Sequence, residues 1–468
     1  MTTPSLTLRG CDFLLAELQE KKSGRYKSGM DTSHSQHGVS SDVSRVRARV
    51  KRAVRDQIRW QDASLEQLVP KDHRVRAVWA YVDSLDLKPL YQKIQAVEGG
   101  VGRDAVDPKI LMTLWMWAII EGISSARHVA RQCEKDFTYM WICGEVGVNH
   151  HLLSDFRTAH GAFLDELLTD TIATLLHAKI VTLETVAQDG MRVRAHAGSS
   201  SFRRQKSLEE CRREAAEQVQ KLRDENADDS ANGHDASNAR RQAARERAAR
   251  EREERVAEAL KNLAELQRQK EQRKKGSGDK ARCSTTDPEA RQMKMGDGGF
   301  RPAYNVQFAT DGGARLIVSV EVTNNGSDGG QMSPMHETVC EKYDKTPENY
   351  LVDGGFSTID DITAVEKKGS RVAAPMTHED RITKRGGDPH ARRASDSNEM
   401  AAFRERMRTD DSKAILKQRP SIAEFPNAEC RNRGLTQFRV RSLEKVRTAT
   451  LWYAITFNFM RMRHLGVL

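Results

Sequence analysis

The sequence predicts an α/β protein, in which an all-α N-terminal region precedes a mixed α/β domain that a long charged helical segment interrupts. Three observations lead to this prediction. Residues 60–180 carry apolar side chains at three- and four-residue spacing, as helices do. Residues 180–376 include several short runs rich in β-branched side chains, as strands do. Between such runs, residues 203–281 are dominated by charged side chains.

Length and composition limit the class of protein. A chain of 468 residues is too long for one ordinary core, and about 150 residues per domain gives about three modules. Hydrophobic residues make up 38% and charged residues 30%, which excludes a membrane protein. The 76 Lys and Arg residues exceed the 66 Asp and Glu residues, giving a net charge of +10. This excess fits a nucleic-acid partner without establishing one.

Cysteine usage and hydropathy indicate the compartment. The seven cysteines are scattered and form no CxxC pair, so neither a disulfide framework nor a zinc site is indicated. The longest apolar run, residues 110–120, is shorter than the roughly 20 residues that span a bilayer. The N-terminus lacks the apolar core of a signal peptide. We therefore expect a reduced protein in the cytoplasm, with no membrane partner.

Residues 1–57 form a basic extension that we expect to be largely disordered, with a Ser-, His- and Gly-rich stretch typical of a linker. Within it, Val43, Val46, Val50 and Val54 have helical spacing and arginines fill the other faces. This short helix is either a solvated linker or a contact for phosphates.

Residues 58–180 predict a helical domain. Asp107 is an expected helix cap, Pro108 the first helical residue, and the helix is apolar nearly all round until Gly122, so we expect it to be buried. Ser124 or Ser125 caps the next helix. Short helices joined by tight turns fit a DNA-binding helix-turn-helix, but any small helical bundle gives the same pattern.

Residues 181–468 predict the α/β domain. A strand-like run follows residue 180, and residues 300–311 and 314–324 form a hairpin around the turn DGG. Two further strand signals, ENYLV and RVAAPM, precede a polar loop at 376–400 and a helical C-terminal part. Within the insertion 203–281, two helices with one thin apolar seam each predict a solvated helical hairpin.

Two aspartates are candidates for chemistry. Asp189 and Asp353 each end a strand-like run and precede glycine, where a carboxylate can reach a ligand that lies close to the backbone. A single such Asp is usually a turn former, but neighbouring strands can bring two carboxylates to one edge. Glu424, with Arg419 and Arg431 on either side, supplies a possible third acid. Carboxylates of this kind suit Mg²⁺, and the arginines suit phosphates.

The chain also contains, in order, AQDGMRVRA, TDPEARQMKMG, YNVQFATD, YLVDGGFS and LKQRPSIAEFPNAECRNRGLTQFRVRSLEKVR. This series resembles the catalytic domain of bacterial insertion-sequence transposases of the DDE class. The upstream block from VDPKILMTLWMWAIIEG to NHHLLSDFRTAHG resembles their helical N-terminal domain. Together these blocks cover roughly residues 58–463.

The resemblance implies a ribonuclease-H-like fold, with Asp189, Asp353 and Glu424 as the three catalytic acids and ligands of Mg²⁺ (or Mn²⁺). The family's last signature runs Tyr, Arg, Glu, Lys along one helix. Here Leu416 stands at the Tyr position, Arg419 lies one residue further from the Glu than usual, and Arg431 replaces the Lys. Glu429 is the alternative third acid.

The resemblance further implies a DNA transposase that cuts the ends of its own element and joins the 3′-hydroxyl to target DNA by two-metal chemistry. We expect Arg192, Arg194, Arg419 and Arg431 to contact DNA, and a homo-oligomer to assemble on terminal inverted repeats in the bacterial cytosol, at the nucleoid. Two alternatives remain: a Mg²⁺-dependent nuclease without strand transfer, and a degenerate copy that binds DNA ends. In TDPEAR, Asp287 is expected to fix a loop more than to bind metal.

Overall fold

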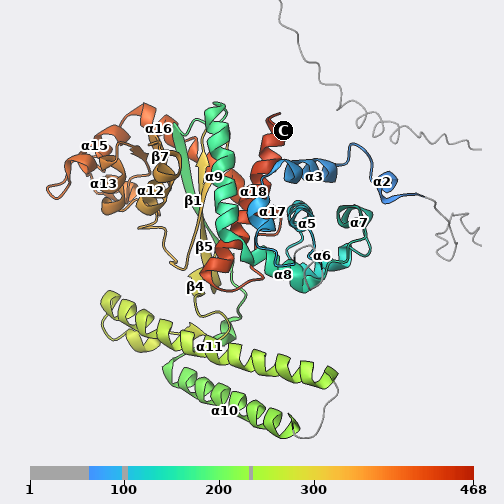
Figure 1. The fold of residues 1–468 in the computed structure, drawn as a ribbon. Helices are drawn as coiled ribbons and strands as arrows, with labels where there is room; N and C mark the ends of the chain where they lie inside the picture. Colours follow the sequence, from blue (N-terminus) through green and yellow to red (C-terminus); the bar gives the residue numbers. More distant parts are fainter. Residues whose placement is uncertain (1–62, 97–103, 231–235) are drawn as a thin grey trace, which may run out of the picture. The chain divides into compact units, whose positions relative to one another are not determined.

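The computed structural model describes residues 63–96, 104–230 and 236–468 (Figure 1). The basic helix expected at residues 43–54 lies outside these residues. Among the residues described, every helix is too short or too polar to cross a bilayer.

The first part of the described chain is helical. Its helices are α2 (Leu65–Leu68), α3 (Arg74–Ser84), α4 (Lys88–Tyr91), α5 (Pro108–Ile120), α6 (Ala126–Gln132), α7 (Phe137–Cys143), α8 (His150–Ala159) and α9 (Gly161–His177). Helix α5 begins as predicted: the Asp107 carboxylate accepts a hydrogen bond from the Lys109 amide at 2.8 Å, and Pro108 is the first residue. All of its residues except Lys109 and Ile120 are buried, which confirms the prediction for this helix.

A six-stranded sheet forms the second part. Its strands are β1 (Thr185–Arg194), β4 (Arg291–Lys294), β5 (Phe300–Asp311), β6 (Ile317–Thr323), β7 (Asn349–Leu351) and β8 (Arg371–Ala373). β1 lies between β5, its antiparallel neighbour, and β7, its parallel neighbour. β6 and β4 pair antiparallel with β5, and β8 pairs parallel with β7. The order β6-β5-β1-β7-β8 is that of a ribonuclease-H-like sheet, so the predicted fold is confirmed.

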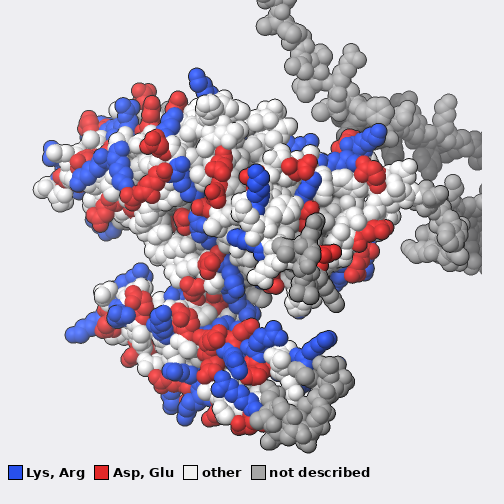
Figure 2. All heavy atoms as spheres, in the orientation of Figure 1, with Lys and Arg blue, Asp and Glu red and all other residues white. Residues whose placement is uncertain are grey.

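The charged insertion forms a helical hairpin, as predicted. It consists of α10 (Gln205–Ser230) and α11 (Ala236–Arg273), with the short turns η2 (Ser199–Ser201) and η3 (Gly278–Lys280) and the paired strands β2 (Phe202–Arg203) and β3 (Cys283–Ser284) at its base. Leu208 from α10 packs with Ala259 and Leu263 from α11 in a small separate core. Figure 2 shows Lys and Arg interspersed with Asp and Glu over the hairpin surface, as expected for solvated helices.

Helices complete the chain. They are α12 (Met332–Tyr343), α13 (Ile359–Lys367), α14 (Glu379–Lys384), α15 (Asn398–Met407), α16 (Asp410–Leu416), the π-helical turn η4 (Pro420–Glu424), α17 (Phe425–Asn432) and α18 (Leu443–His464). The prediction of a polar loop at 376–400 was wrong in two places, because α14 forms within it and α15 begins at Asn398. Acidic residues in the first turn of α14 and basic residues in its last complement the helix dipole.

Helix α18 joins the two parts of the molecule. It packs against β6 and α9 and also against α5 and α8. The indole of Trp452 donates a hydrogen bond to the Arg157 carbonyl of α8 at 3.0 Å, and the rings of Phe459 and Tyr81 stack 4.9 Å apart. One hydrophobic core therefore runs from the N-terminal helices into the sheet.

Candidate active site

Strand pairing brings the segment that carries Asp189 next to the segment that leads to Asp353. Ala187 of β1 is paired with Leu351, the last residue of β7. Asp189 lies two residues further along within β1, and Asp353 lies two residues beyond the end of β7. The two carboxylates are near enough for the charge of Asp353 to raise the pKa of Asp189. The prediction that Asp189 ends a strand was wrong, because β1 continues to Arg194.

The Asp189 carboxylate is largely buried, with 15% of its side chain exposed. The pKa of Asp189 is raised to about 6, chiefly by burial and in part by the nearby charge of Asp353, while the Arg419 guanidinium acts in the opposite direction. Two donors bind its oxygens: the Gly190 amide at 3.0 Å and the Asn427 side-chain amide at 2.8 Å. A bound cation would reduce the repulsion between the two negatively charged carboxylates of Asp189 and Asp353.

The third candidate, Glu424, reaches this region through an irregular helix. Arg419 and Glu424 are five residues apart, whereas an α-helix aligns residues four apart. The π-helical turn Pro420–Glu424 adds one residue to the turn, and Pro426, which lacks an N–H, cannot continue regular α-helical bonding. As a result, the Arg419 guanidinium lies 2.9 Å from the Glu424 carboxylate. The unusual spacing in the sequence is therefore accommodated by the backbone.

Arg419 connects two of the three acids. Its Nη2 binds Glu424 at 2.9 Å, and its Nη1 lies 3.8 Å from Asp189 Oδ1 without a hydrogen-bond partner of its own. Glu424, Asn427 and Arg431 follow each other at three- and four-residue spacing, which puts them on one helix face, and Asn427 on that face contacts Asp189. The alternative acid, Glu429, is paired with Arg433 at 2.9 Å.

Comparison with known proteins identifies both parts of the chain. Residues 63–159 match the family model of a transposase domain, DUF772, and residues 265–459 match the model of the transposase DDE domain. The chain carries a DDE transposase domain. No curated protein and no solved structure matches it. Families of this kind bind DNA and act in DNA transposition, and DDE transposases generally use divalent metals such as Mg²⁺.

The match to the DDE domain begins after Asp189, within the helical hairpin. Strand β1 nevertheless belongs to the same sheet, because it is hydrogen-bonded between β5 and β7, both of which lie inside the matched range. The hairpin α10–α11 thus separates the first strand of the DDE domain from the remainder in sequence, but not in space.

The carboxylates of the DDE domain fit a divalent cation in part. Asp189 and Asp353 present hard oxygen donors at one edge, as Mg²⁺ prefers. The Glu424 side chain is 57% exposed and paired with Arg419. Among residues 63–96, 104–230 and 236–468, no three His, Cys, Asp or Glu side chains are arranged to hold a metal ion. Asp189 and Asp353 are therefore near each other, whereas Glu424 is paired with Arg419.

The predicted DNA-contacting arginines differ in their surroundings. Arg192 is held by hydrogen bonds within the protein, because its Nη2 donates to Asp328 and to the Gly326 carbonyl, both at 3.0 Å. Arg194 is exposed and donates to Gln437 at 2.6 Å. Arg431 is also exposed, and it forms no ion pair with any part of the chain that the structure describes.

Sequence reasoning missed Asn427 and Asp328 in the DDE domain. Asp328 is 8% exposed and lies in the loop after β6, where a Cβ on Gly190 would meet its Oδ1 at 2.4 Å. A signal for it was available: like Asp353, it follows a strand and precedes two glycines. Asn427 carried no comparable signal, because its role depends on the π-helical turn.

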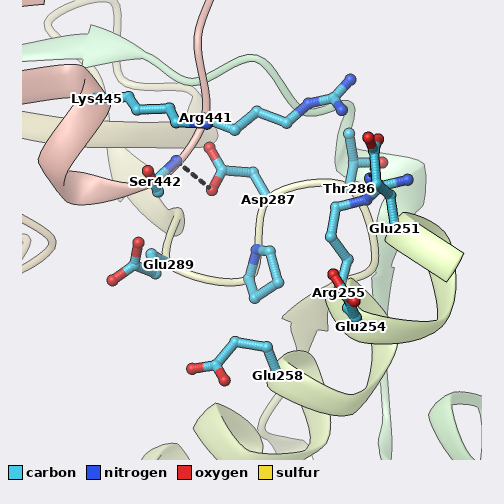
Figure 3. A pocket seen from close by; sticks show the side chains of 11 residues that line it. Glu251, Glu254, Arg255, Glu258, Thr286, Asp287, Glu289, Arg441, Ser442 and Lys445 are labelled. Carbon is cyan, nitrogen blue, oxygen red and sulfur yellow. Dashed lines mark hydrogen bonds and ion pairs between the residues drawn. The ribbon is translucent and has the colours of Figure 1, made fainter. Parts of the chain in front are cut away.

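Asp287 lies apart from this site, beside a pocket of about 700 Å³ between α11 and the start of α18 (Figure 3). Its Oδ1 accepts hydrogen bonds from the Tyr304 hydroxyl at 2.7 Å and the Ser442 amide at 3.4 Å. Glu289, from the same loop, accepts one from the Leu443 amide at 2.9 Å. The loop thereby binds free amides at the N-terminus of α18, as a loop-fixing role requires.

Proposed function

We propose that this protein is a DNA transposase that cuts the ends of its own element and joins the freed 3′-hydroxyl to target DNA, with Asp189 and Asp353 as the ligands of Mg²⁺ or Mn²⁺. The observation that carries the proposal is the proximity of these two carboxylates: β1 pairs with β7, which leads to Asp353, and the charge of Asp353 acts on Asp189. Asp353 lies within the residues that match the transposase DDE domain, and Asp189 lies on β1 of the same sheet. This shared domain supports a role for both acids in cutting and joining DNA.

Each residue has a distinct part in this proposal. Asp189 and Asp353 bind the cation, and Asn427 holds Asp189 in orientation through its 2.8 Å hydrogen bond. When bound, divalent cations activate the attacking oxygen and stabilise the leaving oxygen of a phosphodiester. Arg419 and Arg431 lie on the helix that faces Asp189, where guanidinium groups can bind backbone phosphates.

Glu424 is the third acid of the proposal, and Arg419 controls its availability. Arg419 is paired with Glu424 and also lies near the Asp189 carboxylate, so the ion pair holds the exposed glutamate beside the guanidinium. A DNA phosphate that binds Arg419 competes with Glu424 for the guanidinium. Glu424 is then free to turn towards the cation.

Cleavage of labelled DNA that carries the inverted repeats flanking the gene tests the proposal. Wild-type protein should cut this DNA only with Mg²⁺ or Mn²⁺, and Asp189→Ala and Asp353→Ala should abolish the cut. Full cleavage by either variant would refute the mechanism. Because two ends must be processed together, we expect a homo-oligomer on the DNA.

Two other functions are separated by the products. A nuclease without strand transfer would release cut ends and never yield joined target DNA. A degenerate copy would bind the ends in a salt-sensitive manner without metal-dependent turnover. The pairing of the exposed Glu424 with Arg419 is the observation that favours the degenerate copy.

A further inference from the structure

A buried polar network lies on the face of the sheet opposite to the Asp189 side chain. The Tyr350 hydroxyl of β7 donates to Gln188 of β1 at 2.9 Å, and Gln188 donates to Gln307 of β5 at 3.0 Å. Gln307 in turn donates to Asp328 at 2.9 Å. These side chains are between 0% and 8% exposed, so water does not supply alternative partners. The network therefore crosses all three strands that surround the site.

Asp328 is the anionic end of this network. Its Oδ1 accepts from Asn305 at 2.7 Å as well as from Gln307, and its Oδ2 binds Arg192 at 3.0 Å. Arg192 and Asn305 are register partners on β1 and β5, and so are Gly190 and Gln307. One carboxylate thus binds one side chain of β1, Arg192, and two side chains of β5, Asn305 and Gln307.

The same carboxylate adjoins the backbone next to both candidate ligands. A Cβ on Gly190, the residue after Asp189, would lie 2.4 Å from Asp328 Oδ1. A Cβ on Gly355 would lie 3.5 Å from Asp328 Oδ2, and the Gly355 amide donates to Asp353 Oδ1 at 2.7 Å. Movement of Asp328 would consequently shift the backbone behind Asp189 and the turn that orients Asp353.

We propose that Asp328 is a positioning residue: from behind the sheet it fixes the spacing of Asp189 and Asp353 and so sets their affinity for a divalent cation. This inference rests on the proposed function of those two aspartates. Partners that orient metal ligands from a second layer typically contribute about 10- to 100-fold to metal affinity or activity. Loss of the Asp328 charge also leaves the Arg192 guanidinium without its anion in a half-buried position.

Mn²⁺ binding measured by calorimetry on the full-length protein tests this role directly, with DNA cleavage as a second readout. Asp328→Asn keeps the shape of the side chain and removes the charge. We expect it to weaken Mn²⁺ binding about 10-fold and to slow cleavage, while circular dichroism shows a folded protein. A Tyr350→Phe variant, which opens the other end of the network, should weaken binding by a smaller factor, about threefold; it carries the test if Asp328→Asn does not fold.

Asp311→Asn is the matched control. Asp311 is also fully buried and accepts backbone amides from Leu183 and Ala314, but it lies at the far end of β5. It should lower stability without changing Mn²⁺ affinity. Equal Mn²⁺ affinity in wild type and folded Asp328→Asn, or an equal loss in Asp311→Asn, would overturn the positioning role alone. A wild-type protein whose Mn²⁺ binding is unaffected by Asp189→Asn would instead refute the proposed function, and the positioning role with it.

Discussion

Replacing Gly190 by alanine should destabilise the protein strongly, because the space beside Gly190 is occupied. An added Cβ would lie 2.4 Å from Asp328 Oδ1, 2.5 Å from Gln307 Nε2 and 3.0 Å from Asn305 Oδ1. The ends of flexible side chains can often move aside, but these three are buried, and Asn305 and Gln307 both donate hydrogen bonds to Asp328. The methyl group can enter only by breaking that network.

The size of the effect follows from two contributions. Overpacking a closed interior costs about 1–3 kcal/mol, and a displaced hydrogen bond to a charged group costs about 1.5–3 kcal/mol. Because part of the strain is relieved when the bond breaks, we expect Gly190→Ala to lower the free energy of unfolding by about 3 kcal/mol.

Urea unfolding followed by circular dichroism measures this loss, with Gly354→Ala as the control. A Cβ on Gly354 would meet nothing within 4 Å, so this variant should stay within about 0.5 kcal/mol of wild type. If Gly190→Ala proves as stable as Gly354→Ala, the network around Asp328 is not as rigid as its contacts require.

Three further predictions concern single side chains. Arg419→Gln removes a positive charge that lowers the pKa of Asp189, so the acid limb of the cleavage pH profile should move to higher pH; an unchanged profile contradicts this. Burial lowers the pKa of His336 to about 4, so the fold keeps it neutral, and urea unfolding should show up to about 3 kcal/mol of stability lost as the pH falls from 6.5 towards 4. His336→Gln should flatten that dependence, and an equally steep one would refute it. Tyr304→Phe removes a 2.7 Å donor from the buried Asp287 and should cost about 1–3 kcal/mol in urea unfolding, whereas no change would show the bond to be immaterial.

Local signals in the sequence were sufficient for much of the fold. The Asp107–Pro108 start of α5 was predictable because capping and the first helical turn depend on adjacent residues. The β5–β6 hairpin was predictable for the same reason, since a short turn joins its strands. The start of β1 was not: Leu183 has a φ of 54°, and the strand begins only at Thr185, after a turn that the buried Asp311 carboxylate stabilises from a distant part of the chain.

The candidate site was predictable only where one residue carried its own signal. Asp189 and Asp353 were found because each follows a strand-like run and precedes glycine, although β1 continues past Asp189 to Arg194. The surroundings of Arg192 could not be anticipated, because its partner Asp328 lies 136 residues away in sequence. The contact between Asn427 and Asp189 likewise spans 238 residues and depends on the helix irregularity before Asn427.

The central claim is that Asp189 and Asp353 together bind a divalent cation, and anomalous scattering from crystals grown with Mn²⁺ tests it most directly. We predict a manganese peak in contact with both carboxylates in the wild-type protein, and none at this position in Asp353→Asn. A wild-type peak that touches neither aspartate, or an unchanged peak in the variant, would contradict the account.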